Sequence, residues 1–218
     1  TLSVPVYGNA FFEPNRGFEL VLSHAQNATT SGTAFGIIVD DDLPAELAST
    51  MPKDDLVGME WYLYTIRAPY AWQLATGKGV KVGVFDQGID FLNSDLAANT
   101  NTSLSRSAYT LTSGGAPQTA SDNHGTWVAG VIAAANDGKG VVGVAYNSQL
   151  VSLYTSDAIN SQYFVEIANA FKYAKSLDIL NNSWGFGNLL QSDTDWAFLD
   201  DAKSPLFAPA FAALADLA

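Results

Sequence analysis

The feature that most constrains this chain is an alternation of strand-like and helix-like hydrophobic patterns between residues 79 and 184. Short, β-branched and almost wholly apolar runs are typical of parallel strands covered on both faces. Between them, apolar residues recur every three or four positions, as in a helix with one buried face. The expected strands are 79–85, 149–155 and 177–184, and the expected helices are 125–135 and 159–176. This order predicts an α/β fold with a parallel sheet and crossover helices.

The helix expected at 125–135 contains two sets of candidate contact residues. Apolar side chains at the spacing i, i+3, i+4 and i+7 predict one buried stripe, formed by Val128, Val131, Ile132 and Ala135. Small residues are expected to let the helix lie close to the sheet, namely Gly125, Ala129 and Gly130.

The first 42 residues show a different pattern. "GFELVLS" (17–23) alternates apolar and polar positions with a period of two, and "GTAFGIIVDDD" (32–42) is a second apolar run. The turn-forming residues between them predict a small antiparallel hairpin. Residues 43–58 are rich in Pro, Asp, Ser and Lys and are interpreted as a linker. The predicted organisation is therefore a β segment at 1–42, a linker at 43–58 and an α/β domain at 59–218.

Composition limits the classes of partner. The chain has 218 residues, of which 48 % are hydrophobic, so a sizeable core is available. Its net charge of −12 is the opposite of what a nucleic-acid surface requires. No run approaches the roughly 18 uninterrupted apolar residues of a membrane span. There is no cysteine, which excludes disulfides and thiol chemistry. The first residues, Thr1-Leu2-Ser3, show neither an initiator Met nor a leader, and we expect a chain cut from something longer.

Two residues fall where α/β enzymes keep their chemistry, at the carboxyl ends of strands. Asp86 ends the strand expected at 79–85, and His124 begins the helix that follows. Alone, such an Asp is usually a turn former and such a His is usually a surface residue. Together, a carboxylate can fix the tautomer of an imidazole base and stabilise its protonated form. Gly88 is expected to allow a tight turn directly after Asp86.

The segments around these two residues resemble those of a known family. "VFDQGIDFLNSDL" (84–96) and "DNHGTWVAGVIAA" (122–134) are similar to the aspartate and histidine motifs of subtilisin-like serine proteases, the subtilases. "NNSWG" (181–185) resembles their substrate-binding strand, and "EWYL", "GVAYN" and "SWG" resemble the kexin/furin-like branch. The resemblance implies that Asp86 and His124 are two members of an Asp-His-Ser triad. It further implies that an extended peptide is bound by Ser183, Trp184 and Gly185. Asn93-Ser94 and Trp127 depart from the usual residues beside these motifs.

The nucleophile of such a triad is missing from the sequence. The family carries it in a Gly-Thr-Ser-x-x-x-Pro segment, and no such segment is present. Ser204 lacks the preceding Gly-Thr, and "FGNLL" (186–190) is too early for the oxyanion Asn. We therefore expect the N-terminal half of a subtilase domain, with an incomplete subtilisin-like fold. A chain without nucleophile and oxyanion donor is predicted to be inactive by itself.

The resemblance also implies a structural calcium ion. In the family, such an ion is bound by the loop that "AANDGKGVVGVA" (134–145) resembles and by an Asp in the "SDL" turn. The implied donors are the side chains of Asp95 and Asp137 and the backbone carbonyls of Ala135, Lys139 and Val141. The alternative is an ordinary turn at Asn136-Asp137-Gly138. Residues 13–42 resemble the closing strands of a Calx-beta domain, in which Glu13 and Asp40 to Asp42 match acidic positions.

These features predict a serine endopeptidase that acts on extended peptide or protein substrates, binds Ca²⁺ and is secreted or held at the surface of a bacterial cell. The alternative is a non-catalytic calcium-binding or adhesion module on a degenerate protease scaffold. The Asp-His pair favours the enzyme, because a scaffold requires neither residue. A nucleotide site at "GKGVKVGVFD" is disfavoured because both phosphate-loop patterns are absent.

Overall fold

The computed structural model describes residues 3–9, 11–21, 33–40, 42–156, 161–185 and 208–217. The chain forms two compact units. The first comprises Thr1–Ala75 and Gly138–Val141, and the second comprises Thr76–Asp137 and Val142–Ala218. The boundaries expected at residues 42 and 58 remain predictions.

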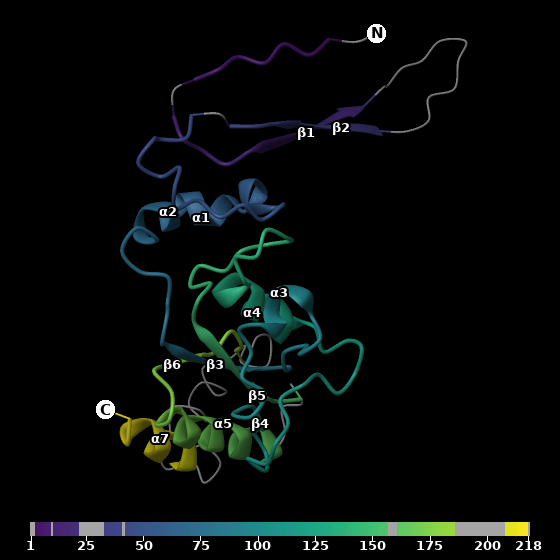
Figure 1. Cartoon of the computed structure of the whole chain (residues 1–218). Coiled ribbons are helices and arrows are strands. Elements are labelled where there is room, and N and C mark those ends of the chain that lie inside the picture. Colours follow the sequence, from purple (N-terminus) through teal and green to yellow (C-terminus); the bar gives the residue numbers. More distant parts are fainter. Residues whose placement is uncertain are drawn as a thin grey trace, which may run out of the picture. The chain divides into compact units, whose positions relative to one another are not determined.

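The first unit contains a hairpin followed by short helices (Figure 1). Strands β1 (Arg16–Val21) and β2 (Thr33–Ile38) pair antiparallel, with Arg16 opposite Ile38. Phe18 and Leu20 are half-buried while Glu19 between them is exposed, as the period of two predicts. The elements that follow are the 3₁₀ helix η1 (Val57–Met59), α1 (Trp61–Thr65) and α2 (Ala68–Ala71).

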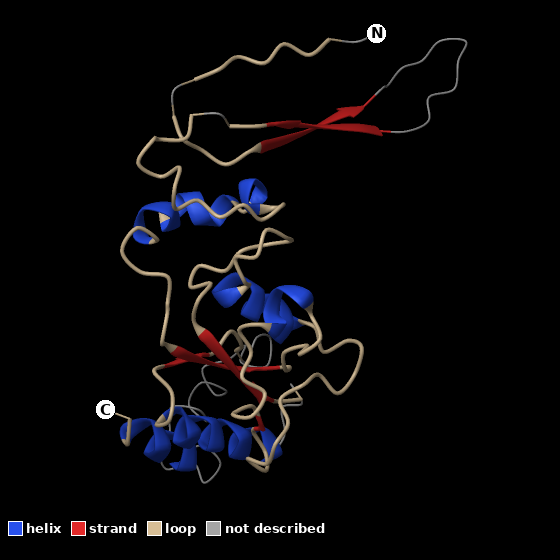
Figure 2. Cartoon of the chain, in the orientation of Figure 1, coloured by secondary structure: helices blue, strands red, loops and turns tan. Residues whose placement is uncertain are grey.

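The second unit is built on a four-stranded parallel sheet (Figure 2). The strand order is β4-β5-β3-β6, so the central strand β3 pairs with both β5 and β6. The strands are β3 (Lys81–Asp86), β4 (Arg106–Ser107), β5 (Gln149–Tyr154) and β6 (Ile179–Asn181). The helices are α3 (Ser94–Ala97), α4 (His124–Ala133), α5 (Ser161–Ala174) and α7 (Ala208–Ala215). The α/β fold with a parallel sheet is thereby confirmed.

Helices cover both faces of this sheet. Figure 1 shows α3 and α4 on one side and α5 and α7 on the other. On the second side, Phe85 of β3 and Leu153 of β5 pack with Tyr163, Phe164 and Ile167 of α5 in one buried cluster. Burial of β3 from Val82 to Asp86 explains its almost wholly apolar sequence, because neither face meets water.

The buried face of α4 is only partly the one expected. Of the predicted stripe, Ala135 is buried and Val128 and Ile132 are half-buried, but Val131 is 47 % exposed. The residues of α4 that are buried are small and recur every four positions, namely Gly125, Ala129 and Ala133. Close packing against the sheet selects the small face, because larger side chains would hold the helix away. Gly130 does not share this role, since a Cβ there would meet no atom within 4 Å.

The last strand is shorter than the sequence predicted. The strand expected at 177–184 ends at Asn181, and the residues that follow are coil. None of the helices in the described part of the chain combines the length and the apolar character that crossing a membrane requires.

Candidate active site

Asp86 is the last residue of the central strand β3, and its side chain is 2 % exposed. Its backbone oxygen accepts a hydrogen bond from Thr155 N at 2.8 Å, which fixes the strand end to the residue after β5. Its Oδ1 accepts a second from the backbone N–H of Gln87 at 2.7 Å. The carboxylate is therefore held rigidly at the carboxyl edge of the sheet.

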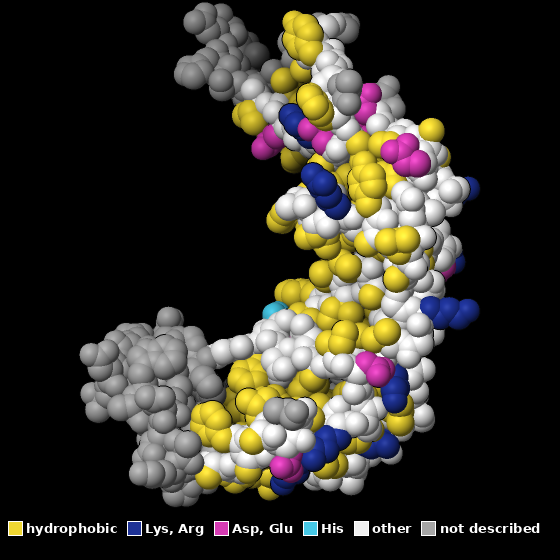
Figure 3. Space-filling view, turned by 90° about the vertical axis from the view of Figure 1, so that its left-hand side faces the viewer, with side chains coloured by type: hydrophobic (Ala, Val, Ile, Leu, Met, Phe, Trp, Pro, Cys, Tyr) yellow, Lys and Arg dark blue, Asp and Glu magenta, His cyan; other side chains and the backbone are white. Residues whose placement is uncertain are grey.

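His124 is the first residue of α4 and turns its ring toward Asp86. Its Nδ1 lies 2.9 Å from Oδ1 and 3.0 Å from Oδ2 of Asp86. An ionised carboxylate can only accept, so Nδ1 carries the proton and Nε2 of a neutral ring is left as an acceptor. The ring is 47 % exposed and reaches the surface, where it is cyan in Figure 3. The expected contact between these two side chains is confirmed.

Two glycines make this approach of helix and strand sterically feasible. Gly88 has a φ of +90°, in the left-handed region that favours glycine, so the chain can turn sharply after Asp86. A Cβ on Gly125 would lie 2.4 Å from the backbone oxygen of Gly88 and 3.1 Å from Cβ of Asp86. A glycine at position 125 therefore lets α4 begin directly against the end of β3.

The Asp-His pair lines a pocket of about 330 Å³ together with the segment after β6. Ser183, Trp184 and Gly185 line the same pocket, so the structure brings together five residues that the sequence analysis selected. Ser183 and Gly185 are exposed, whereas Trp184 is partly buried. The indole packs edge-on against Phe85 and Tyr163, with ring centroids 5.6 and 5.5 Å apart. These contacts anchor the segment beside β3.

Two further residues of this pocket, Gln87 and Tyr163, were not expected from the sequence. Gln87 directly follows Asp86, and its Oε1 lies 3.4 Å from the backbone N of His124. Its position directly after Asp86 could have identified Gln87 from the sequence as a residue of this site. Tyr163 is one of several aromatic residues in an amphipathic helix, and nothing in its local sequence distinguishes it.

Part of the expected calcium loop is in contact with Asp95. The backbone N–H of Ala135 donates to the backbone oxygen of Asp95 at 2.7 Å, and Asp137 follows two residues later. Carboxylate and carbonyl oxygens are the donors that Ca²⁺ prefers, so these residues fit the ion in chemical type. Over the described ranges, however, no group of three or more acidic, His or Cys side chains is arranged to hold a metal. Lys139 and Val141 belong to the first compact unit.

The described part of the chain does not include Ser204, the "FGNLL" segment at 186–190 or Asp41.

Comparison with known proteins identifies the family. A profile of the Subtilase family matches residues 77–210, which include Asp86, His124 and the segment 183–185. The chain belongs to the subtilase family. The assignment made from the aspartate, histidine and substrate-strand motifs is thus confirmed.

Curated relatives of this subtilase match the same region. Neuroendocrine convertase 2 of Homo sapiens is 34 % identical over 149 residues, covering 61 % of this chain and 23 % of the convertase. An extracellular serine protease of Serratia marcescens is 34 % identical over 127 residues, covering 58 % of this chain and 12 % of that protein. The chain therefore spans about a quarter or less of the length of these relatives. The match to a convertase agrees with the kexin/furin-like branch.

A solved structure supports the fold. Fervidolysin from Fervidobacterium pennivorans, described as a keratinolytic enzyme related to subtilisin, superposes with a TM-score of 0.50 at 23 % identity. The match covers 75 % of this chain and 24 % of fervidolysin. At this identity the likeness establishes the subtilisin-like fold.

Proposed function

We propose that the chain carries the Asp-His half of the active site of a serine endopeptidase. The observation that supports this most is the hydrogen-bonded pair Asp86–His124 at the carboxyl edge of a subtilase sheet. An exposed ring and a buried, fixed carboxylate are what a base and its orienting group require.

In this mechanism, His124 acts as the general base through Nε2. It takes the proton of a serine hydroxyl that attacks the scissile carbonyl, and later gives this proton to the leaving amine. Asp86 keeps Nδ1 protonated and stabilises the imidazolium formed in between. The sequence contains no Gly-Thr-Ser-x-x-x-Pro segment, so the serine must come from another segment of a longer protein. We propose that the 218-residue chain alone hydrolyses no peptide.

The substrate is proposed to be an extended peptide or protein segment. The backbone of exposed Ser183 and Gly185 can add the substrate as a further strand, which is a common mode of peptide recognition. Trp184 holds this segment beside the Asp-His pair through its contacts with Phe85 and Tyr163. The acyl half of the substrate would then lie in the pocket that contains His124.

We also propose a structural Ca²⁺ ion near Asp95, Asp137 and the carbonyl of Ala135. The ion would tie the loop after α4 to the turn that begins α3. This proposal is supported by donor type and by the Ala135–Asp95 hydrogen bond. A place of action outside the cytoplasm is supported by the Serratia marcescens relative, which is named an extracellular serine protease.

The test is a fluorogenic peptide assay on two proteins, the 218-residue chain and a longer polypeptide that includes a serine segment. We expect serine-inhibitor-sensitive hydrolysis only by the longer protein. In that protein, Asp86→Asn should lower kcat about 10⁴-fold, because an amide favours the wrong tautomer of the imidazole. His124→Ala should reduce kcat at least as strongly.

The matched control is His24→Ala, which removes the other of the two histidines and is expected to leave kcat unchanged. Full activity of the His124→Ala protein would overturn the proposal. A longer protein that folds, binds Ca²⁺ and hydrolyses nothing would instead favour the non-catalytic module.

A further inference from the structure

Two polar side chains of β5 lie beside the proposed active site and have no part in the chemistry described above. Ser152 is fully buried and Tyr154 is half-buried. Successive side chains of a strand point to opposite faces of the sheet, and Leu153 between these two packs with α5. Ser152 and Tyr154 therefore face the side of the sheet that α3 and α4 cover (Figure 1).

Both hydroxyls bind the segment 115–122, here called the 115–122 loop, which leads directly into His124. Ser152 Oγ donates to the backbone oxygen of Gly115 at 2.6 Å, at the start of the loop. The hydroxyl of Tyr154 donates to Oδ2 of Asp122 at 3.2 Å, at the end of the loop. Two residues on one face of β5 thus hold both ends of the loop.

The start of the loop is also fitted against the turn after β3. Ile89 N donates to Gly115 O at 3.0 Å. A Cβ on Gly88 would lie 2.7 Å from the backbone N of Pro117, so backbone packs directly on backbone here. This part of the loop therefore has little room to shift.

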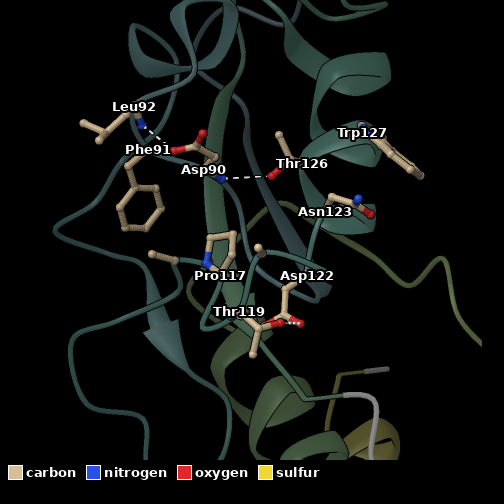
Figure 4. A pocket seen from close by; sticks show the side chains of 11 residues that line it. Asp90, Phe91, Leu92, Pro117, Thr119, Asp122, Asn123, Thr126 and Trp127 are labelled. Carbon is tan, nitrogen blue, oxygen red and sulfur yellow. Dashed lines mark hydrogen bonds between the residues drawn. The ribbon is translucent and has the colours of Figure 1, made fainter.

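The outer side of the loop borders open space. A pocket of about 510 Å³ lies between the loop, the turn after β3 and the start of α4 (Figure 4). Asp90 and Asp122 both line this pocket. Packing therefore does not hold the end of the loop on this side, and hydrogen bonds have to do so.

Asp122 collects these hydrogen bonds. Its carboxylate accepts from Thr119 Oγ1, from the backbone N–H groups of Gln118 and Thr119, and from Tyr154. Figure 4 shows the side chains of Thr119 and Asp122 turned toward each other. Burial raises the pKa of this carboxyl, but the hydrogen bonds outweigh burial and the net pKa is lowered. Of the four donors, Tyr154 alone lies outside the loop, so it is the one that ties this carboxylate to the sheet.

The position of His124 depends on this tie. Asn123, the residue before α4, makes no side-chain hydrogen bond that caps the helix. Its backbone N–H donates to Ser121 O at 2.9 Å, which lies within the loop. The backbone N of His124 lies 3.4 Å from Gln87 Oε1, a long contact. The start of α4 is therefore placed mainly by the loop that precedes it.

Tyr154 also adjoins the other half of the Asp-His pair, because it is the register partner of Asp86 between β5 and β3. One residue thus meets the strand end that carries the carboxylate and, through its hydroxyl, the loop that carries the imidazole. We infer that Tyr154, assisted by Ser152, is a positioning residue that keeps the ring of His124 in hydrogen-bonding geometry with Asp86. Its effect on catalysis rests on the proposed peptidase function.

The positioning can be measured without catalysis. Tyr154→Phe removes the hydroxyl and keeps the ring. In the 218-residue chain, ¹⁵N NMR of the imidazole nitrogens, at a pH where both histidines are neutral, gives the ratio of the Nδ1–H to the Nε2–H tautomer. We expect Nδ1–H to predominate at His124 in the unaltered chain, because Asp86 accepts that proton. Tyr154→Phe should lower this ratio about fivefold, the factor that one hydrogen bond contributes.

The matched control is Tyr173→Phe, which removes a hydroxyl that donates to Leu104 O at 2.8 Å. It deletes the same group and should leave the ratio at His124 unchanged, as a general loss of stability would. An unchanged ratio in Tyr154→Phe, or an equal fall in Tyr173→Phe, would overturn the inference.

A double-mutant cycle tests the route through Asp122. Asp122→Ala should itself lower the ratio at His124, and adding Tyr154→Phe should then produce no further fall, because the two groups act through one hydrogen bond. Effects that multiply would mean that Tyr154 acts by another path, and they would contradict the inference.

The consequence for catalysis is tested with the longer, serine-containing protein. We expect Tyr154→Phe to lower kcat about fivefold and to leave KM unchanged, because Tyr154 does not line the pocket that contains 183–185. Tyr173→Phe should change neither constant. A rise in KM without a fall in kcat would contradict a positioning role. If the unaltered longer protein hydrolyses no peptide, the proposed function fails, and the tautomer ratio still decides whether Tyr154 positions His124.

Discussion

Individual carboxylates of this chain have different roles because their surroundings differ. Asp86 is buried and meets an imidazole, Asp90 is exposed with one oxygen free in the described structure, and Asp122 accepts four hydrogen bonds. All three lie near the amino end of α4. The three carboxylates therefore differ in burial and in the hydrogen bonds that hold them.

The structural role of Asp122 predicts a pH-dependent stability. Its pKa in the folded chain is below the ordinary value of 3.8, so the ionised form stabilises the fold above that pH. This contribution is lost as the pH falls through the lowered pKa. We expect Asp122→Asn to lower the free energy of unfolding by about 1 kcal/mol at pH 7 and by progressively less below pH 3.8.

Urea unfolding at several pH values measures this difference. Asp216→Asn is the control, because an exposed ion pair contributes little at any pH. An Asp122→Asn effect that is the same at pH 7 and pH 3 would show that the charge is not involved.

At the level of secondary structure, α4 depends on glycine at one position and tolerates it at another. Gly125 faces the end of β3, where a Cβ would lie 2.4 Å from Gly88 O. Gly130 lies in the same helix, where a Cβ would meet no atom within 4 Å. The two positions therefore separate close packing from helix propensity.

We expect Gly125→Ala to destabilise the chain by about 1–3 kcal/mol, because the methyl group overlaps backbone atoms that cannot move freely. Gly130→Ala should stabilise it by about 0.5–1 kcal/mol, since alanine is the better helix former. Both values are obtained from urea unfolding at neutral pH. Two variants of equal stability would contradict the contact assigned to Gly125.

The loop after α4 gives a second prediction at this level. If Asp95 and Asp137 help to hold Ca²⁺, millimolar CaCl₂ should raise the Tm of the chain, because a ligand that binds only the folded state stabilises it. Asp137→Ala should remove this rise, and Asp216→Ala should retain it. A Tm that is unaffected by CaCl₂ in the unaltered chain would exclude the calcium site.

At the scale of the whole molecule, each compact unit is made of two separate stretches of the sequence. Residues 138–141 belong to the first unit although they follow α4 of the second. Gly138 N donates to Asp54 Oδ1 at 3.1 Å, and Leu56 N donates to Gly140 O at 2.9 Å. Any truncation that removes Asp54 and Leu56 therefore leaves the inserted loop without these contacts.

This arrangement predicts that two truncations will differ in stability. Deleting residues 1–42 removes the hairpin and keeps both hydrogen bonds, whereas deleting residues 1–75 removes them. We expect the shorter product to melt about 4–8 °C below the longer one, from two hydrogen bonds of about 1 kcal/mol each. Differential scanning calorimetry measures the two Tm values. Equal melting temperatures would mean that these hydrogen bonds do not support the loop.

The sequence by itself determined the class of the fold and the Asp-His pair. Strands such as β3 and β5 are short, apolar runs, and helix α5 has a clear amphipathic period, so local hydrophobic pattern was sufficient to recognise them. Asp86 and His124 could be recognised because they stand at the ends of such elements and within specific motifs. The segment 183–185 could likewise be recognised by its motif, and it lines the same pocket as Asp86 and His124.

The tertiary structure decided what depends on distance through space. The sequence placed Gly125 and Ala129 against the sheet, but periodicity alone could not reveal that Ala133 completes this face while Val131 is exposed. The part played by Tyr163, 39 positions after His124, and the facing of Asp90 and Asp122 across a pocket were equally invisible. These contacts join segments far apart in the chain. Local sequence encodes which elements form, whereas close packing among distant elements selects the faces they bury and the cavities they enclose.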